Sequence, residues 1–343
     1  MSELLNGYCC EDETADRALS FTSTNNFIKT RGLTLSSLGC GTYLGNDDNE
    51  TQVTIQEALC ELVCSGLNVI DTAPNYRNGR SEEAIGAALR EVCAKGVSRK
   101  AIFVSTKVGI LPDTIGHYPK ETICGQFCFS PEYILSSVEA SRNRLGVDTL
   151  DCLYLHNFDE AQVSLSGEHR EDVIDAMMQV IKTLLEKNWI RTVGLATWSG
   201  LRVEVDHPAY IDLLGWEKRF RMHGLDKYFG MIQLPLGVWA PEALLATVQK
   251  SPLTGQPMTP LRVANELGLT VIANSCLLQG EILSIKPPDF SGNSELNTAQ
   301  QFIQWTRSQP DVAITLVGMK NKNSVKDGKQ IMALPKCDYI GLK

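Results

Sequence analysis

The sequence predicts an α/β protein folded as a closed (β/α)8 TIM barrel, and three observations lead to that class. Short apolar runs with the composition of strands alternate with longer stretches of helical periodicity, which is typical of a parallel sheet covered by helices. Eight such units occupy about 300 residues, the expected size of a closed barrel. A doubly wound sheet usually carries a GxGxxG turn after its first strand, and the short "GCGT" found there does not supply one.

The expected elements follow in order along the chain. Residues 1–25 are polar and acidic without clear periodicity, so we expect a flexible extension, followed by a single barrel domain over 26–343. Apolar stretches on both sides of Arg31-Gly32 predict a β-hairpin that caps the bottom of the barrel. The eight strands are predicted at 38–42, 68–72, 101–107, 150–156, 191–197, 231–235, 269–274 and 312–318.

Helix signals stand between these strands. The stretch 54–66, "TIQEALCELVCSG", ends on a glycine, and 130–146, "SPEYILSSVEASRNRLG", opens with Ser-Pro-Glu and closes on a glycine, as helix caps do. The segment 200–230 is long and mixed in composition, so it is a candidate lid or partner surface. We expect long βα loops at the carboxyl-terminal face of the barrel, the face that carries reactive residues in this fold.

Composition narrows the class of function. Forty acidic residues against 32 basic ones give a net charge of −8, which offers no electrostatic reason to expect nucleic acid or an anionic membrane as a partner. No apolar leader and no run of 18 apolar residues occurs, so we expect a soluble cytoplasmic protein. The 11 cysteines are scattered without paired CxxC units or histidines at zinc spacing, which favours reduced thiols and no metal site. Oligomeric state stays open.

Four reactive side chains fall at adjacent strand ends. Asp71, Lys107 and His156 end the second, third and fourth strands, and Tyr76 lies in the loop after the second. Each alone has an ordinary structural explanation, but four together are harder to dismiss. A nearby ammonium lowers the pKa of a phenol, so we expect Lys107 to make Tyr76 a stronger acid, Asp71 to anchor the lysine, and His156 to hold a carbonyl oxygen. This set predicts protonation of an oxygen on which charge builds.

The segment "IDTAPNYRNGRSEEAIG", the "STK" strand end and the "LDCLYLH" strand resemble the aldo-keto reductase family, over about residues 27–332. The family's Asp-Tyr-Lys-His tetrad falls on Asp71, Tyr76, Lys107 and His156. The resemblance implies an oxidoreductase that uses NADP(H) to reduce an aldehyde or ketone to an alcohol. In that reaction the hydride comes from nicotinamide and the proton from Tyr76.

The resemblance also implies a cofactor site, with departures from the family pattern. Ala196 and Thr197 stand where the family has Ser-Asn, Asn274 stands where a tyrosine usually stacks on nicotinamide, and Gly328 replaces an asparagine that reads adenine. A basic cluster after the eighth strand suits a phosphate, although a solvated basic turn is the simpler alternative. The implied contacts are Gly41, Thr42, Thr197, Gln233, Asn274, Ser275, Leu277, Gly280, Gly318, Lys320, Asn321, Ser324 and Asp327.

Loop residues suggest where a small-molecule substrate would bind. His117, Trp198 and Trp239 are candidates for pocket lining, against the alternative that loop aromatics cover core. Asp159 and Glu160, just past His156, are interpreted as a solvated loop rather than a second acid-base pair.

Two other functions stay open. Because the tetrad matches the family and the nicotinamide contacts do not, the barrel could run a cofactor-independent dehydration, isomerisation or cyclisation with the same four residues. Similarity to the potassium-channel β-subunit branch of the family also allows a non-catalytic binding subunit, whose contacts would come from the acidic extension or from 200–230. The sequence does not identify the substrate, the direction of reaction, or a preference for NADP over NAD.

Overall fold

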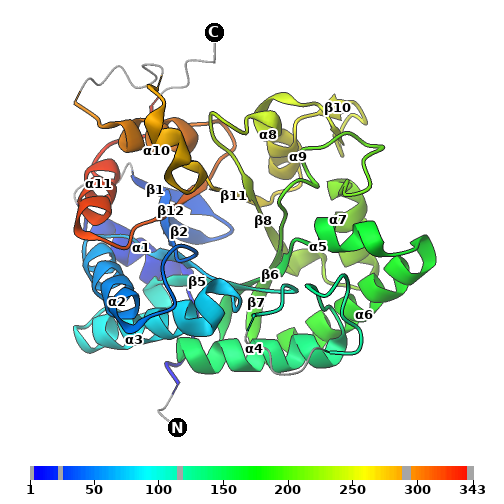
Figure 1. Cartoon of the computed structure of the whole chain (residues 1–343), viewed down its shortest axis with the longest axis horizontal. Helices are drawn as coiled ribbons and strands as arrows, with labels where there is room; N and C mark the ends of the chain where they lie inside the picture. Colours follow the sequence, from blue (N-terminus) through cyan, green and yellow to red (C-terminus); the bar gives the residue numbers. More distant parts are fainter. Residues whose placement is uncertain (1–3, 22–25, 114–118, 288–294, 338–343) are drawn as a thin grey trace.

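A computed structural model describes residues 4–21, 26–113, 119–287 and 295–337. Eight parallel strands close into a barrel in the order β11-β12-β3-β4-β5-β6-β7-β8, so the predicted TIM barrel is confirmed (Figure 1). Each observed strand overlaps its predicted run. The strands are β3 (Leu38–Gly41), β4 (Val69–Asp71), β5 (Phe103–Val108), β6 (Leu150–His156), β7 (Ile190–Ala196), β8 (Phe229–Pro235), β11 (Thr270–Asn274) and β12 (Ile314–Gly318).

Helices surround the strands on the outside of the barrel (Figure 1). Two of their ends are capped as helices usually are. The Asp48 side chain accepts from the Thr51 N–H at the start of α2, and Gly146, with φ of 67°, ends α4 where the sequence predicts. No helix in the described ranges is long and apolar enough to cross a membrane. The larger helices are α2 (Asn49–Cys64), α3 (Arg80–Ala94), α4 (Pro131–Leu145), α6 (Gly167–Glu186), α7 (Leu213–Met222), α9 (Pro260–Glu266), α10 (Thr298–Arg307) and α11 (Lys322–Met332).

Two apolar clusters hold the fold together. The larger one lies between strands and helices, and the smaller one fills the barrel interior with side chains such as Val69, Phe103, Cys152 and Tyr154. Burial of a large apolar side chain contributes about 1.5–3 kcal/mol. Gly194 makes room for the Tyr154 ring, because a Cβ there would lie 2.5 Å from a ring carbon. The interior below the strand ends is therefore packed, and chemistry is confined to the mouth.

The predicted hairpin closes the bottom of the barrel, as expected. Strands β1 (Phe27–Thr30) and β2 (Leu33–Ser36) pair in antiparallel fashion across a turn in which Arg31 and Gly32 have φ of 48° and 80°. The Ser36 N–H donates to Asn68 Oδ1 at 2.7 Å, just before β4 begins. This contact ties the hairpin to the amino-terminal ends of the barrel strands.

The expectation of a flexible extension is wrong for residues 4–21. They include α1 (Glu11–Leu19), which buries Thr14 and Ala18 and carries three acidic residues in its first turn, where the helix dipole favours them. The Cys9 N–H donates to the buried Asp151 Oδ1 at 2.6 Å, and the Thr34 N–H donates to Thr14 Oγ1 at 3.1 Å. The segment is therefore part of the barrel bottom.

The lid interpretation of 200–230 fails for the half that contains α7. This helix buries Trp216 and Phe220, and the Phe220 ring stacks on Phe229 of β8 with centroids 4.4 Å apart. Its amphipathic face makes it an ordinary outer helix of the barrel. A small antiparallel pair, β9 (Gln249–Lys250) and β10 (Pro257–Met258), lies in the following βα connection and has no counterpart among the predicted elements.

Candidate active site

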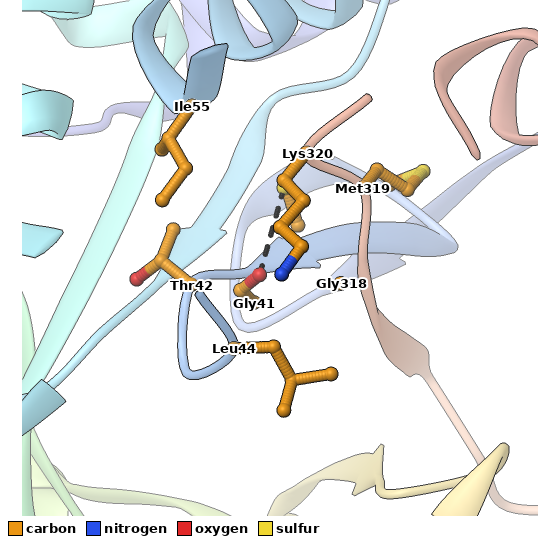
Figure 2. A pocket seen from close by; sticks show the side chains of 8 residues that line it. Gly41, Thr42, Leu44, Ile55, Gly318, Met319 and Lys320 are labelled. Atoms are coloured by element: carbon orange, nitrogen blue, oxygen red, sulfur yellow. Dashed lines mark hydrogen bonds between the residues drawn. The ribbon is translucent and has the colours of Figure 1, made fainter. Parts of the chain in front are cut away.

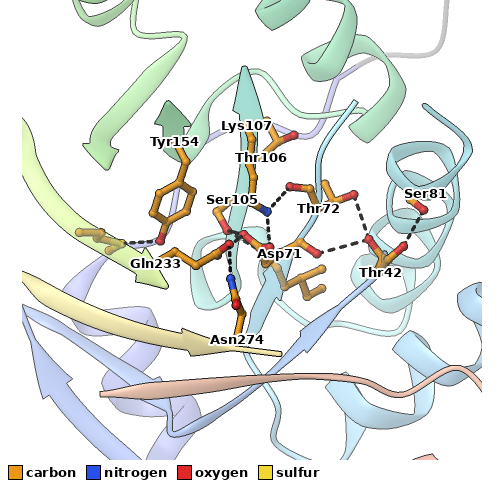
Figure 3. Close-up of polar contacts among 12 residues, drawn as sticks. Thr42, Asp71, Thr72, Ser81, Ser105, Thr106, Lys107, Tyr154, Gln233 and Asn274 are labelled. Carbon is orange, nitrogen blue, oxygen red and sulfur yellow. Dashed lines mark hydrogen bonds and ion pairs between the residues drawn. The ribbon is translucent and has the colours of Figure 1, made fainter. Parts of the chain in front are cut away.

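A buried acid stands at the centre of the barrel mouth. Asp71 is paired with Ser105 in the register of β4 and β5, and Lys107 lies two residues further along β5. Because side chains alternate along a strand, Ser105 and Lys107 point the same way, toward Asp71. The Lys107 Nζ lies 2.5 Å from Asp71 Oδ2, and the Ser105 hydroxyl donates to Oδ1 at 2.7 Å (Figure 3). Each charge thus offsets the cost of burying the other.

Lys107 is fixed at its tip by two oxygens. Besides Asp71, its ammonium donates to the Thr72 carbonyl at 2.8 Å, and 5.0 Å separates it from the centre of the Tyr76 ring. Burial lowers the pKa of Lys107, but Asp71 and then Tyr76 raise it further, so that it stands above its ordinary value. The side chain is therefore a permanent cation at neutral pH, beneath the phenol.

Tyr76 begins the 3-10 turn η2 (Tyr76–Gly79) and is half-buried. Its ring meets Tyr43 and His156 edge to face, with centroids 5.0 and 6.1 Å away. Burial raises the pKa of Tyr76, and the attraction of Lys107 for a phenolate lowers it only part of the way back. The expectation that Lys107 makes this phenol a stronger acid is thus wrong in its net effect, because loss of solvent outweighs the ammonium. At neutral pH the phenol keeps its proton and can donate it.

His156 ends β6 and is a neutral imidazole. Burial, and then the nearby Lys107 cation, place the pKa of His156 well below its ordinary value. Its Nδ1 is buried and meets no hydrogen-bond partner among the residues described. A buried polar atom without a partner costs free energy, so this nitrogen is suited to a ligand.

Three amide and hydroxyl side chains lie across the mouth from β4. Asn274 Nδ2 donates to Gln233 Oε1 at 3.3 Å, and Gln233 Nε2 donates to Asp71 Oδ1 at 3.0 Å, so the glutamine amide links the two (Figure 3). Thr197 follows β7, which is next to the strand of Gln233. Thr197 Oγ1 and Asn274 Oδ1 are buried without a partner in the described part of the chain. The arrangement leaves a hydroxyl and a carbonyl oxygen for a bound polar group.

The loop after β11 turns sharply beside these residues. Ser275 has φ of 55°, and Gly280 has φ of 101° in the turn that also includes Leu277. The Ser275 carbonyl accepts from Trp239 Nε1 at 2.8 Å, which ties the loop after β8 to the loop after β11. Trp239 lies against Trp198 with ring centroids 6.3 Å apart. The third candidate for pocket lining, residue His117, lies outside the described residues.

A small pocket opens between the ends of β3 and β12. The pairing of Gly41 with Gly318 leaves the strand ends without bulky side chains at this point. Thr42 and Lys320 join them in the pocket wall, so four of the expected cofactor residues come together (Figure 2). The Thr42 hydroxyl donates to Thr72 Oγ1 at 2.9 Å. The remaining wall residues are Cys40, Leu44, Ile55 and Met319.

The expected cofactor residues at the start of α11 make hydrogen bonds with other residues of the protein. Asn321 and Ser324 form a capping box, each side chain accepting from the other's backbone N–H. Asp327 accepts from Asn297 Nδ2 at 2.9 Å. Gly328 is buried, and a Cβ there would lie 2.3 Å from Met319 Sδ, so packing explains the small residue. Of these later positions, Lys320 alone lines the pocket.

Two functional contacts escaped the sequence interpretation. Ser105 could have been found, because it stands two residues before Lys107 on the same strand face. Asp159 was expected in a solvated loop, but it is buried and accepts from the Ser199 and Gly200 N–H groups at 2.9 and 2.8 Å. Burial raises the pKa of Asp159. This acid therefore holds the backbone that follows Trp198.

Known proteins share this fold and sequence pattern. Residues 37–206 match the family described as aldo/keto reductase. A probable voltage-gated potassium channel subunit beta from Arabidopsis thaliana is 26% identical over 328 residues, which are 89% of this chain and 90% of that one. The NADH-specific methylglyoxal reductase of Escherichia coli (strain K12) is 32% identical over 188 residues, 52% of each chain.

Solved structures show the same architecture. An aldo-keto reductase from Klebsiella pneumoniae, crystallised with NADPH, aligns over 90% of both chains with a TM-score of 0.63 and 17% identity. A glycerol dehydrogenase from Gluconobacter oxydans covers 92% of each chain with a TM-score of 0.59 and 19% identity. At these identities the solved structures show the shared fold, and the matched segment 37–206 shows that the chain belongs to the aldo/keto reductase family of oxidoreductases.

Proposed function

We propose that this protein reduces the carbonyl group of a small aldehyde or ketone to an alcohol, with NADP(H) as cofactor and Tyr76 as proton donor. The observation that carries the proposal is the buried Asp71–Lys107 pair beneath a protonated phenol, beside a neutral His156. Two relatives support it by what their names state. The NADH-specific methylglyoxal reductase supports the reduction of a small carbonyl compound, and the structure solved with NADPH supports NADP(H) as the cofactor.

The residues at the mouth fit a nicotinamide dinucleotide. When bound, a reduced nicotinamide supplies a hydride to the carbonyl carbon. Thr197 Oγ1 and Asn274 Oδ1 have unused hydrogen-bonding capacity and would hold its carboxamide. Asn274 cannot stack as an aromatic ring does, so in this chain that position would act by hydrogen bonding. Lys320, in the pocket between β3 and β12, would meet a phosphate of the same molecule.

The chain's own residues handle the proton. Tyr76 and His156 lie on the same side of the mouth, so a carbonyl oxygen between them can accept a hydrogen bond from each. As charge develops on that oxygen, the phenol O–H breaks and the proton passes to the oxygen. The phenolate left on Tyr76 faces the Lys107 ammonium, which stabilises it, and Asp71 keeps that ammonium in place. Tyr76 then takes a proton from solvent.

The decisive experiment is an assay for reduction of methylglyoxal and of an aromatic aldehyde, in which the loss of nicotinamide absorbance measures the rate. We expect Tyr76→Phe to lower kcat by about 10²- to 10⁴-fold while NADPH still binds, because only the proton donor is removed. Tyr228→Phe, a phenol before β8 at the barrel bottom, is the matched control and keeps wild-type rates. Equal activity in Tyr76→Phe, or a wild-type protein that binds neither NADPH nor NADH, would overturn the proposal.

Two alternatives have specific support. The Arabidopsis relative named as a channel subunit spans 89% of this chain, which favours a binding subunit; a wild-type protein that binds NADPH without turnover would point to it. The Gln233 amide is already bonded to Asp71 and Asn274, which favours acid-base chemistry without a cofactor. Product formation in the absence of dinucleotide, lost in Tyr76→Phe, would identify that activity.

A cytoplasmic location is part of the proposal. All 11 cysteines are free in the structure, and six of them are buried. Free thiols persist where glutathione and thioredoxin keep the compartment reducing. Fluorescent fusion of the full chain, imaged in cells, tests this placement, and secretion of the fusion would contradict it.

A further inference from the structure

The backbone immediately after Tyr76 is held in an unusual conformation. Arg77, Asn78 and Gly79 have φ of 51°, 55° and 89°, so three residues in a row are left-handed. Glycine adopts this region readily, but residues with a Cβ do so at a cost in free energy. Such a conformation persists only where the surroundings enforce it, and it is often found at functional sites.

The side chains of this segment form hydrogen bonds and an ion pair with the loop between β3 and α2. The buried Arg77 donates from Nε to the Asn46 carbonyl at 2.7 Å and from Nη2 to the Asp48 carbonyl at 3.1 Å. Asn78 Nδ2 donates to Asp47 Oδ2 at 3.1 Å, and Arg80 Nε lies 3.4 Å from Asp47 Oδ1. These contacts, which we call the Arg77 clamp, enforce the left-handed backbone.

The clamped loop carries Tyr43 onto the phenol. At its first end, the Thr42 carbonyl accepts from the Ser81 hydroxyl at 2.8 Å; at its other end, it is held by the clamp. Between these anchors, the Tyr43 ring lies edge to face on Tyr76, 5.0 Å between centroids, with 53% of its surface exposed. Tyr43 thus covers part of the Tyr76 ring.

We propose that Arg77 is a positioning residue for Tyr76: its guanidinium fixes the loop 42–48, so that Tyr43 stays against the phenol and covers it. The inference rests on the proposed role of Tyr76 as proton donor. Arg77 acts through Tyr43 and does not touch the Lys107–Asp71 pair, so its loss leaves the charges beneath the phenol unchanged. Burial has the largest influence on the pKa of Tyr76, and the clamp sustains that burial.

A matched control exists at the opposite end of the barrel. Arg31 is also left-handed, with φ of 48°, and donates to two carbonyls, of Lys227 at 2.7 Å and Gly268 at 3.4 Å. Arg31→Gly therefore removes the same kind of side chain from the same kind of backbone, far from Tyr76. Arg77→Lys keeps the positive charge but loses the planar fork that reaches two carbonyls.

The test compares Arg77→Gly, Arg77→Lys and Arg31→Gly in the full chain by three measurements. Hydrogen–deuterium exchange over 42–48 reports the loop directly. Ultraviolet titration, as the difference between each protein and its Tyr76→Phe counterpart, reports ionisation of that phenol. Steady-state reduction of methylglyoxal with NADPH separates kcat from KM.

We expect Arg77→Gly to speed exchange over 42–48, to shift Tyr76 ionisation to lower pH because the phenol gains solvent while Lys107 stays, and to lower kcat by about tenfold. Arg77→Lys should fall between wild type and Arg77→Gly, and Arg31→Gly should leave all three measurements unchanged. Unchanged exchange and titration in Arg77→Gly, or equal effects of Arg31→Gly, would overturn the proposal. A wild type without turnover would refute the proposed function, while exchange and titration would still decide the clamp.

Discussion

Asp71 divides its two oxygens between different partners although it is almost entirely removed from water. Oδ2 faces the Lys107 ammonium, and Oδ1 receives the Ser105 hydroxyl and the Gln233 amide. Removing one member of a buried ion pair leaves an unpaired charge, which costs roughly 3–5 kcal/mol. The pair therefore sets both the stability of the mouth and the charge beneath Tyr76.

A double-mutant cycle tests this coupling. We expect Asp71→Asn to lower the free energy of unfolding by about 3–5 kcal/mol, because Lys107 is left buried without a counter-charge. Adding Lys107→Met should recover most of that loss, while reduction of methylglyoxal stays abolished in both variants. Urea unfolding at neutral pH measures the stabilities. Losses that simply add in the double variant would contradict the coupling.

His156 gives the fold a pH dependence whose sign follows from its environment. Its pKa is well below the ordinary value when folded, so between that value and about 6.5 the unfolded chain binds a proton that the folded chain refuses. The stabilisation that the neutral His156 gives the folded state is fully present above pH 6.5, and it is lost as the pH falls from there through the pKa of His156 in the folded protein. The protein should lose up to roughly 1.4 kcal/mol of stability per pH unit from this group.

Urea unfolding at pH 7.5 and 5.5 checks this expectation. His156→Gln should show a smaller decrease in stability between the two pH values than the wild type, because the variant has no imidazole to protonate there. His169→Gln, an exposed position on α6, serves as the control and should behave as the wild type does. An equal decrease in wild type and His156→Gln would refute the buried neutral imidazole.

For these four residues, the sequence predicted where the side chains lie better than it predicted how buried they are. The alternation of side chains and the ends of strands placed Asp71, Lys107 and His156 at one mouth, and the structure brings them together. The net effect on the pKa of Tyr76 could not be predicted, because it depends on how deeply the fold buries the phenol, and one of its contacts, Tyr43, comes from a loop after another strand. The burial of the Tyr76 phenol arises from packing between segments distant in sequence, whereas the charged neighbour Lys107 can be identified from the sequence motif.

At the scale of elements, α3 and α4 pack so closely that a glycine is required. A Cβ at Gly86 would lie 2.4 Å from the Arg144 carbonyl oxygen, a backbone atom that cannot move aside without shifting α4. On helix propensity alone, replacing a helical glycine by alanine would be favourable by about 1 kcal/mol. Contact geometry therefore opposes propensity at this position.

Gly86→Ala should lower the free energy of unfolding by about 1–3 kcal/mol, since inserting a methyl group into a packed contact forces the backbone apart. Gly167→Ala is the matched control: it is helical in α6, has nothing within 4 Å of its added Cβ, and should be neutral or stabilising. Thermal or urea unfolding distinguishes the two. A stabilised Gly86→Ala would show that propensity outweighs the contact.

The elements that the sequence missed are those with few buried residues. The eight barrel strands stood out because buried parallel strands are continuously apolar. Helix α1 buries only Thr14 and Ala18 within its nine residues and is strongly polar, so its composition predicts a flexible segment. Its position is fixed by contacts of neighbouring backbone, such as the Cys9 N–H with Asp151, which a local pattern does not reveal.

For the whole molecule, one buried arginine joins the segment before the first barrel strand to the segment after the last one. Arg307 donates to the Ser37 hydroxyl at 2.7 Å beside the hairpin, and to the Ile331 and Leu334 carbonyls at 2.9 and 2.8 Å at the end of α11. It thereby joins segments about 270 to 300 positions apart in sequence. No sequence pattern predicts this contact, because each partner is an ordinary backbone or hydroxyl group.

Arg307→Lys should lower the free energy of unfolding by about 3 kcal/mol or more, because one ammonium cannot satisfy acceptors arranged for a planar fork. Arg262→Lys, an exposed arginine whose nearest carboxylate oxygen is 3.8 Å away, should change stability by less than about 0.5 kcal/mol. Urea unfolding of both variants measures the difference. Similar small losses in the two proteins would show that the ends of the chain do not depend on Arg307.

The buried thiol of Cys152 can report transient opening of the barrel. It lies inside the barrel with none of its surface exposed, and burial raises its pKa to about 12, so a labelling reagent meets almost no thiolate there. Cys64, on the outer surface of α2, reacts without any opening. Pulse labelling with a thiol reagent, followed by mass spectrometry, would therefore measure how often the barrel strands separate at Cys152. The labelling rate of Cys64 in the same sample is the internal reference.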